Sequence, residues 1–185
     1  MKIVSTLVML AATAALLPFG VAADTVKPAA EVGARAPAFT LADSRGAKVS
    51  LADLTASGKV ALVFFRSADW CPFCIAQLKE LQESLPAFEA AGIEVVGISY
   101  DSVDTLAKSA AKHGLTLALL SDEGSKTIDA FGIRNHEAKG KGVGVPHPAV
   151  FLVDSKGTIT AKLMHEGHRT RPTPGDILAA AHGMK

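Results

Sequence analysis

The chain has 185 residues, a nearly balanced charge of 19 Lys and Arg against 18 Asp and Glu, and only two cysteines. This length fits one ordinary domain with a substantial core, and the absence of a basic run argues against nucleic acid or an anionic membrane as partner. Two cysteines would make a sparse disulfide scaffold, which a chain of this length does not need, so the pair is better explained by chemistry.

The N-terminus, residues 1–23, is predicted to be a secretory signal peptide. A short basic start, an apolar stretch at 3–17 and small residues at 21–23 form this pattern. The apolar stretch is shorter than the ~20 residues of a membrane-spanning helix, although an uncleaved N-terminal anchor stays the alternative. We therefore expect a mature domain over residues 24–185 that is periplasmic or secreted, with no stable membrane insertion after cleavage.

The first half of the domain is predicted to contain a hairpin, a central strand and a long helix. Alternating apolar residues at 39–41 and 49–51, separated by a turn, indicate a β-hairpin. A continuous apolar run at 60–65 suits a central strand. A helix is expected to begin at the cysteines and to continue through the amphipathic stretch 75–91, with a kink at Pro86.

The second half continues the alternation of strands and helices. Strands are predicted over residues 93–99, 117–120, 149–153 and 158–164, and helices over 102–113, 125–131 and 174–181. A glycine-rich loop is expected over 135–144. The order βαβαβαββα indicates one α/β domain with no internal repeat.

The two cysteines stand in the segment Trp70-Cys71-Pro72-Phe73-Cys74, between the central strand and the long helix. A cysteine at a helix start meets unpaired N–H groups and the positive end of the helix dipole, which lower the thiol pKa from about 8.5 to roughly 3.5–7.5. Such a thiolate attacks disulfides, and a second cysteine one turn on expels the mixed disulfide. The segment predicts a redox-active disulfide in which Cys71 attacks and Cys74 resolves.

A zinc site and a purely structural disulfide are the two other uses of this pair. Zinc would require two more ligands, but there is no second cysteine pair and the six histidines are scattered, the nearest pattern being His165 and His168. A disulfide between residues so close in sequence removes little entropy from the unfolded chain. We expect redox chemistry, with no metal and no cofactor.

Three segments carry a resemblance to known families. Residues 63–74 resemble the thioredoxin superfamily, whose active site is W-C-x-x-C after the central strand, and residues 148–154 resemble its cis-proline leading into the next strand. Residues 33–43 resemble the N-terminal hairpin of peroxiredoxins of the alkyl hydroperoxide reductase and thiol-specific antioxidant group, and of periplasmic thioredoxins used in cytochrome maturation. The resemblance implies an α/β thioredoxin-like fold, a central mixed sheet flanked by helices with an N-terminal β-hairpin.

The site departs from both relatives. Peroxiredoxins use P-x-x-x-[ST]-x-x-C, and counting back from either Cys71 or Cys74 supplies neither the proline nor the hydroxyl. Their arginine at the start of the later strand is replaced here by Pro148, and the buried acid of thioredoxins by Phe65. The chain resembles a peroxiredoxin-like group with a thioredoxin-type motif, in which Cys74 corresponds to the peroxidatic position.

The resemblance also implies a substrate groove beside the disulfide. A cis-proline would leave the backbone of the preceding residue free to pair with a substrate strand, and the spacing favours His147-Pro148 over Val145-Pro146. Trp70 is expected to cover the disulfide, and His147 to flank the thiolate. An ordinary trans-proline, a packing tryptophan and a bystander histidine are the alternatives.

The sequence supports three functional hypotheses. The principal hypothesis is an exported thiol–disulfide oxidoreductase that exchanges its Cys71/Cys74 dithiol or disulfide with substrate proteins and with an upstream electron donor or acceptor. The alternative is a thiol peroxidase, in which peroxide oxidises Cys74 to a sulfenic acid and Cys71 closes the disulfide. The third is a non-catalytic thioredoxin-fold module. The missing hydroxyl and arginine weigh against the peroxidase, and the intact Cys-Pro-Phe-Cys motif weighs against the module.

Overall fold

The computed structural model describes residues 30–165 and 169–183. The strands are β1 (Thr40–Asp43), β2 (Lys48–Ser50), β3 (Lys59–Phe64), β4 (Ile93–Ser99), β5 (Ala118–Ser121), β6 (Ala149–Val153) and β7 (Ile159–Met164). The helices are α1 (Leu51–Ser57), α2 (Pro72–Glu83), α3 (Leu85–Ala90), α4 (Val103–His113), α5 (Lys126–Ala130), the 3₁₀ turn η1 (Gly140–Gly142) and α6 (Pro174–Ala181).

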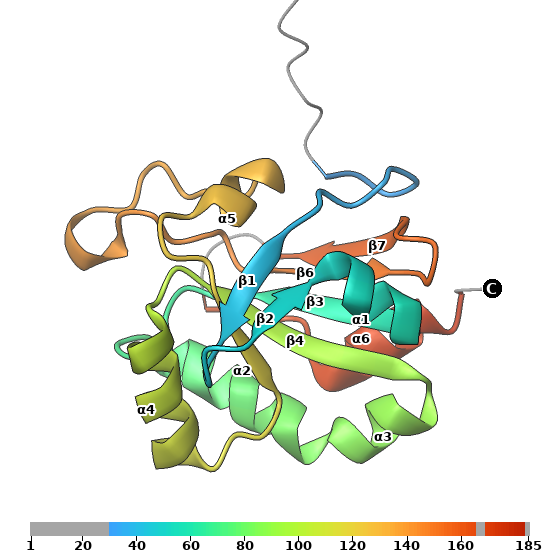
Figure 1. Cartoon of the computed structure of the whole chain (residues 1–185), viewed down its shortest axis with the longest axis horizontal. Coiled ribbons are helices and arrows are strands. Elements are labelled where there is room, and N and C mark those ends of the chain that lie inside the picture. The colour runs from blue at the N-terminus through green and yellow to red at the C-terminus, as the bar shows by residue number, and fades with distance from the viewer. Residues whose placement is uncertain (1–29, 166–168, 184–185) are drawn as a thin grey trace, which may run out of the picture.

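Within the described residues, the strands form a single seven-stranded sheet in the order β2-β1-β5-β4-β3-β6-β7 (Figure 1). Strand β3 pairs in parallel with β4 and antiparallel with β6, so the strand that leads into the cysteine pair lies inside the sheet. The antiparallel pair β1 and β2 forms the predicted N-terminal hairpin. The predicted class, a central mixed sheet flanked by helices, is confirmed.

Helices cover both faces of the sheet (Figure 1). Helices α2, α4 and α6 pack on the face to which Val63 points. Helices α1 and α5 pack on the opposite face, where the ring centroid of Phe64 lies 4.8 Å from that of Phe131. Because successive residues of a strand point to opposite faces, the apolar run at 60–65 is buried on both sides.

Two helical segments differ from the sequence-based prediction. The helix expected to run from the cysteines to residue 91 begins there but is interrupted at Ser84, so that Pro86 lies in the first turn of a separate helix, α3. Proline is accommodated there because the first N–H groups of a helix have no intrahelical acceptor. Helix α1 was not predicted; it is only seven residues long and begins directly after Ser50, whose hydroxyl caps it.

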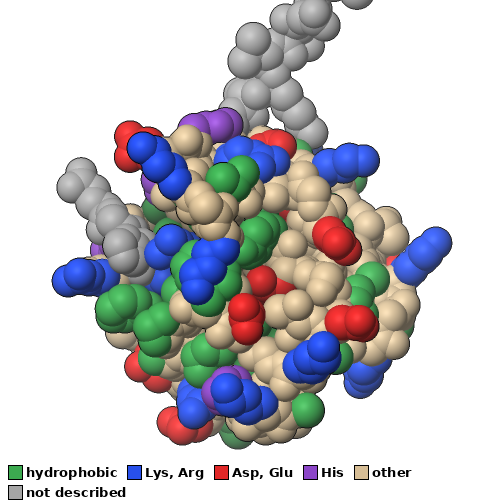
Figure 2. Space-filling model, turned by 90° about the vertical axis from the view of Figure 1, so that its left-hand side faces the viewer, with side chains coloured by type: hydrophobic (Ala, Val, Ile, Leu, Met, Phe, Trp, Pro, Cys, Tyr) green, Lys and Arg blue, Asp and Glu red, His purple; other side chains and the backbone are tan. Residues whose placement is uncertain are grey.

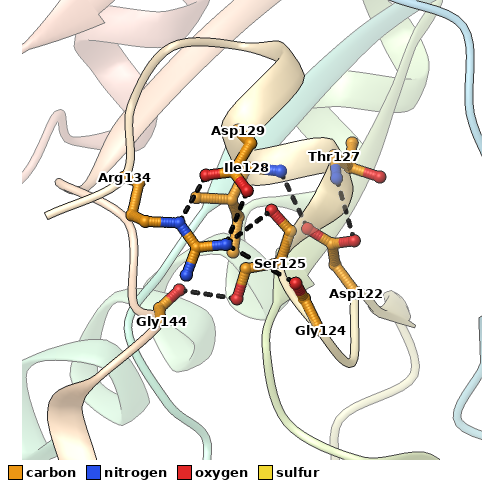
Figure 3. A network of polar contacts seen from close by, with 8 residues as sticks. All are labelled: Asp122, Gly124, Ser125, Thr127, Ile128, Asp129, Arg134 and Gly144. Carbon is orange, nitrogen blue, oxygen red and sulfur yellow. Dashed lines mark hydrogen bonds and ion pairs between the residues drawn. The ribbon is translucent and has the colours of Figure 1, made fainter. Parts of the chain in front are cut away.

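A polar network holds the segment that follows β5 (Figure 3). The Asp122 carboxylate accepts two backbone N–H groups from the first turn of α5, at 3.0 and 2.8 Å. The Ser125 hydroxyl donates to the carbonyl of Gly144 at 2.8 Å. Arg134 pairs with Asp129 and also donates to the carbonyl of Ser125 at 3.3 Å. These contacts fix both ends of the glycine-rich loop between α5 and β6.

The predicted signal peptide at residues 1–23 lies outside the described residues and stays a prediction, as does the exported location. Among the helices that the structure describes, none combines the length and apolar character needed to cross a membrane.

Candidate functional site

The two cysteines lie at the start of α2, directly after the central strand. They form a disulfide with their Cα atoms 5.2 Å apart. Cys71 is the N-cap residue of α2 and Cys74 lies in its first turn, as the sequence predicts. Cys71 is only 2% exposed and Cys74 is fully buried. The disulfide therefore lies beneath the surface, out of direct reach of a bulky partner.

An arginine that the sequence analysis did not single out lies against the sulfurs. Arg171 belongs to the segment between β7 and α6, and its Nη2 lies 3.5 Å from Cys74 Sγ and 3.9 Å from Cys71 Sγ. Burial, together with the nearby Arg66, lowers the pKa of Arg171 to about 10, so the guanidinium is still charged at neutral pH. A cation at this distance favours the thiolate form of a cysteine in the reduced protein.

A buried carboxyl group holds the loop before the cysteines. The Asp101 carboxylate accepts the backbone N–H of Ala68 at 2.7 Å, the hydroxyl of Ser99 at 2.8 Å and the hydroxyl of Ser67 at 2.9 Å. Burial raises the pKa of Asp101, although these three hydrogen bonds act in the opposite direction. Asp101 thus ties the end of β4 to the turn that positions Cys71, a role that no local sequence pattern indicates.

Replacing Asp101 by alanine should destabilise the protein by about 3 kcal/mol, because three buried donors lose their acceptor together. Asp101→Asn is the matched control, since it keeps one acceptor oxygen and should destabilise less. Urea unfolding of the reduced and the oxidised protein measures both effects. A loss below about 0.5 kcal/mol for alanine would show that water replaces the carboxylate at no cost.

The loss of stability caused by replacing Asp101 should depend on pH. Because burial raises the pKa of Asp101 above 3.8, the folded protein binds this proton more tightly than the unfolded chain. Ionisation therefore reduces stability as the pH rises from about 3.8 through the folded-state pKa, and asparagine lacks this effect. The destabilisation caused by Asp101→Asn should be larger near about pH 3 than at about pH 7.

Two cations lie over the ring of Trp70, the residue that precedes Cys71. Its indole N–H donates to the Tyr100 hydroxyl at 3.0 Å, and that hydroxyl donates to the backbone carbonyl of Lys141. The guanidinium carbon of Arg66 lies 4.8 Å from the ring centroid, and the ammonium nitrogen of Lys141 lies 5.2 Å from it. The half-buried indole is a fixed platform that joins the turn before α2 to the glycine-rich loop.

The predicted cis-proline is wrong. No peptide bond among the described residues is cis, so Pro148 and Pro146 both follow trans bonds. The His147 N–H donates to the carbonyl of Ile133 at 2.7 Å, and Pro146 forms a β-bridge with Arg134. This backbone is therefore already paired within the protein at the place where the predicted groove would receive a substrate strand. Pro148 is buried and His147 is half-buried.

The sheet nevertheless brings these residues to the same end as the cysteines. Ala149 pairs with Phe64, so the start of β6 lies beside the end of β3, where the turn carrying Trp70 and Cys71 begins. Metal binding has no support from the described side chains, among which no group of three His, Cys, Asp or Glu could hold an ion.

A disulfide at the turn from a central strand to a helix, in a mixed sheet of this order, defines a thiol-based oxidoreductase of the thioredoxin superfamily. Comparison with known proteins narrows this class: the chain belongs to the AhpC/TSA family, which it matches over residues 32–162. The resemblance of the sequence to peroxiredoxins of this group is confirmed.

In sequence, the chain is similar to proteins that are named as peroxiredoxins. The chain is 39% identical over 128 residues to a protein of Mycobacterium tuberculosis named as a peroxiredoxin, covering 69% of this chain and 80% of that protein. It is 34% identical over 130 residues to peroxiredoxin Bcp of Escherichia coli, covering 70% of this chain and 82% of that protein. The crystal structure of peroxidoxin BcpB of Mycobacterium tuberculosis has the same fold, with a TM-score of 0.73 and 24% identity over 83% of this chain and 97% of that one.

Proposed function

We propose that this protein is a thiol peroxidase that reduces hydroperoxides, with the Cys71–Cys74 disulfide as the oxidised product. The burial of both cysteines carries this proposal, because thiol–disulfide exchange with a protein requires access to a sulfur, whereas a small peroxide needs only a narrow path. The membership of the AhpC/TSA family and the peroxiredoxin relatives support it. The thiol peroxidase, which the sequence alone favours less, is thus preferred over the exported thiol–disulfide oxidoreductase.

The reaction has two steps and needs no further cofactor. The Cys74 thiolate attacks one oxygen of the hydroperoxide and the O–O bond breaks; with one proton the leaving oxygen departs as an alcohol, or as water from hydrogen peroxide, and Cys74 becomes a sulfenic acid. The Cys71 thiol then attacks the sulfenic sulfur, which releases water and forms the disulfide. A dithiol small enough to reach the buried sulfurs then reduces this disulfide and is itself oxidised to a disulfide.

Arg171 supports the assignment of Cys74 as the attacking residue. Its guanidinium lies closer to the sulfur of Cys74 than to that of Cys71, at 3.5 Å against 3.9 Å. In peroxiredoxins an arginine at the start of the strand corresponding to β6 helps to hold the thiolate and the peroxide. Here Pro148 stands at that position, and the charge comes instead from the segment before α6.

A direct comparison of two activities tests the proposal. The reduced protein should consume hydrogen peroxide about a thousandfold faster than a simple thiol of low pKa, because the site positions and stabilises the reacting groups. It should accelerate the dithiothreitol-dependent reduction of insulin only weakly. Stopped-flow peroxide consumption and insulin turbidity measure the two rates. Strong insulin reduction with peroxide consumption at the level of a free thiol would return the assignment to the protein oxidoreductase.

A further inference from the structure

We infer that Arg66, Lys141 and Trp70 form a subsite for the carboxylate of an acidic organic hydroperoxide. The inference rests on the proposed peroxidase function, because it names the class of peroxide that the site accepts. Trp70 directly precedes Cys71 in the chain. Its side chain packs against the apolar cluster that contains both cysteines, so a molecule that contacts the indole lies near the redox pair.

Among the side chains that the structure describes, no carboxylate forms an ion pair with either cation at the indole. Within the described residues, the ion pairs are formed by Arg45, Arg134 and Lys162, not by Arg66 or Lys141. Attraction to the ring holds each cation in place but leaves its charge unneutralised. A bound carboxylate would supply the missing negative charge, and would offset the repulsion between the two positive groups.

A third cation extends this positive region to the sulfurs. Nη2 of Arg171 lies 3.5 Å from Cys74 Sγ, and the guanidinium carbon of Arg66 lies 4.8 Å from the centroid of the indole ring. The charge of Arg66 adds to burial in lowering the pKa of Arg171. The positive region thus runs from the indole of Trp70 to the disulfide. An anionic substrate would be attracted along its whole length.

The subsite is preformed. Trp70 donates to the Tyr100 hydroxyl, which in turn donates to the carbonyl of Lys141. Gly142 lies beside both groups: a Cβ atom there would be in ordinary contact with Nη2 of Arg66, at 3.8 Å, and with the edge of the indole, at 4.0 Å. The network of Figure 3 anchors the same loop at its base. A ligand therefore gains contacts without first having to order this loop.

The chemistry of these side chains selects the ligand class. A guanidinium binds a carboxylate through two parallel N–H···O bonds, and an indole receives an apolar body on its face. Figure 2 shows the side of the molecule that carries the glycine-rich loop, and on it Lys and Arg side chains lie beside and over hydrophobic ones. A hydroperoxide that carries both a carboxylate and an apolar group fits this arrangement, whereas hydrogen peroxide has neither feature.

The kinetic test compares cumene hydroperoxide with its para-carboxylated analogue, which adds one negative charge. The wild type should show a kcat/KM about tenfold higher for the carboxylated compound, and the ratio should fall to about one in R66Q/K141Q. Because the ratio is taken within each variant, a general loss of activity cancels. K139Q is the matched control, since it removes a charge from the same loop at a lysine outside the indole contact, and it should keep the wild-type ratio.

A binding measurement separates the subsite from the proposed reaction. Trp70 is the only tryptophan of the chain, so its fluorescence reports on the subsite directly. Titration of the oxidised protein with unreactive 4-isopropylbenzoate should give a saturable change, whereas 4-isopropylbenzamide should give none. R66Q/K141Q should lose the response; if that variant does not fold, K141Q, at an exposed residue, provides the same comparison.

The two measurements give distinguishable outcomes. Saturable binding of the benzoate without any peroxide turnover would overturn the proposed function and leave an anion site. Rapid peroxide turnover with a substrate ratio of about one, and no fluorescence response to the benzoate, would overturn the subsite alone. An equal loss of preference in K139Q would assign the effect to the general charge of the loop, and would also overturn the subsite.

Discussion

Replacing Cys74 by serine should abolish peroxide reduction, whereas replacing Cys71 by serine should leave the first oxidation step intact. Cys74 is the fully buried member of the pair and the one closer to Arg171, which favours its thiolate. We expect a loss of at least about a thousandfold for Cys74→Ser, because a serine hydroxyl does not replace the thiolate. In Cys71→Ser, one equivalent of peroxide should still be consumed rapidly, but no disulfide should form.

Trapping of the sulfenic acid distinguishes the two cysteines. After one equivalent of peroxide, Cys71→Ser should give a dimedone adduct on Cys74 by mass spectrometry, and Cys74→Ser should give none. The opposite pattern, with turnover retained in Cys74→Ser, would identify Cys71 as the attacking residue. In that case its place at the N-cap of α2 would outweigh the proximity of Arg171 to Cys74.

Elements specified by local pattern were predicted closely. Strand β4 and helix α6 have the predicted bounds, because a continuous apolar run and a capped amphipathic stretch are properties of neighbouring residues. The redox pair was located for the same reason, since strand, turn and helix adjoin it in sequence. Helix α1 was missed because seven residues give little periodicity.

The groups that set the chemistry of the pair come from distant parts of the chain. Arg171 is separated from Cys74 by 97 positions, and Asp101 from Ala68 by 33, so no local motif connects them. The families that the sequence resembles suggest an arginine at the position of Pro148 and a buried acid at that of Phe65, and neither group is present there. In the fold, Arg171 from the segment before α6 lies beside the sulfurs, and Asp101 from the end of β4 holds the loop before them.

The prediction of a cis-proline was wrong for a similar reason. The spacing between Pro148 and β6 matches the thioredoxin pattern, but spacing does not reveal which group the preceding backbone contacts. In the structure, the His147 N–H is already bound to Ile133. The backbone at His147 is therefore not available to pair with a protein strand. The features that remain accessible at the site are charged side chains and one indole. Together with the burial of the sulfurs, this favours small substrates over proteins.

Replacing Arg171 by glutamine should slow peroxide reduction by about 10- to 100-fold at pH 7, with an effect that shrinks at higher pH. The guanidinium favours the charged form of the thiol, so its removal should raise the pKa of the attacking cysteine towards the value of about 8.5 of free cysteine. Above that pH the thiolate forms in both proteins, and the difference due to protonation disappears. Rates of peroxide consumption between about pH 5 and pH 10 measure this shift.

Two further variants show whether the effect belongs to the charge of Arg171 at the sulfurs. Arg169→Gln removes the same charge from an exposed residue of the same segment and should leave the pH profile unchanged. Arg171→Lys keeps the charge but not the planar fork, and should recover part of the rate. If Arg171→Gln lowered the rate equally at every pH, the arginine would act by packing alone. If it changed neither rate nor profile, the thiolate would depend on the N-terminus of α2 without help from the C-terminal segment.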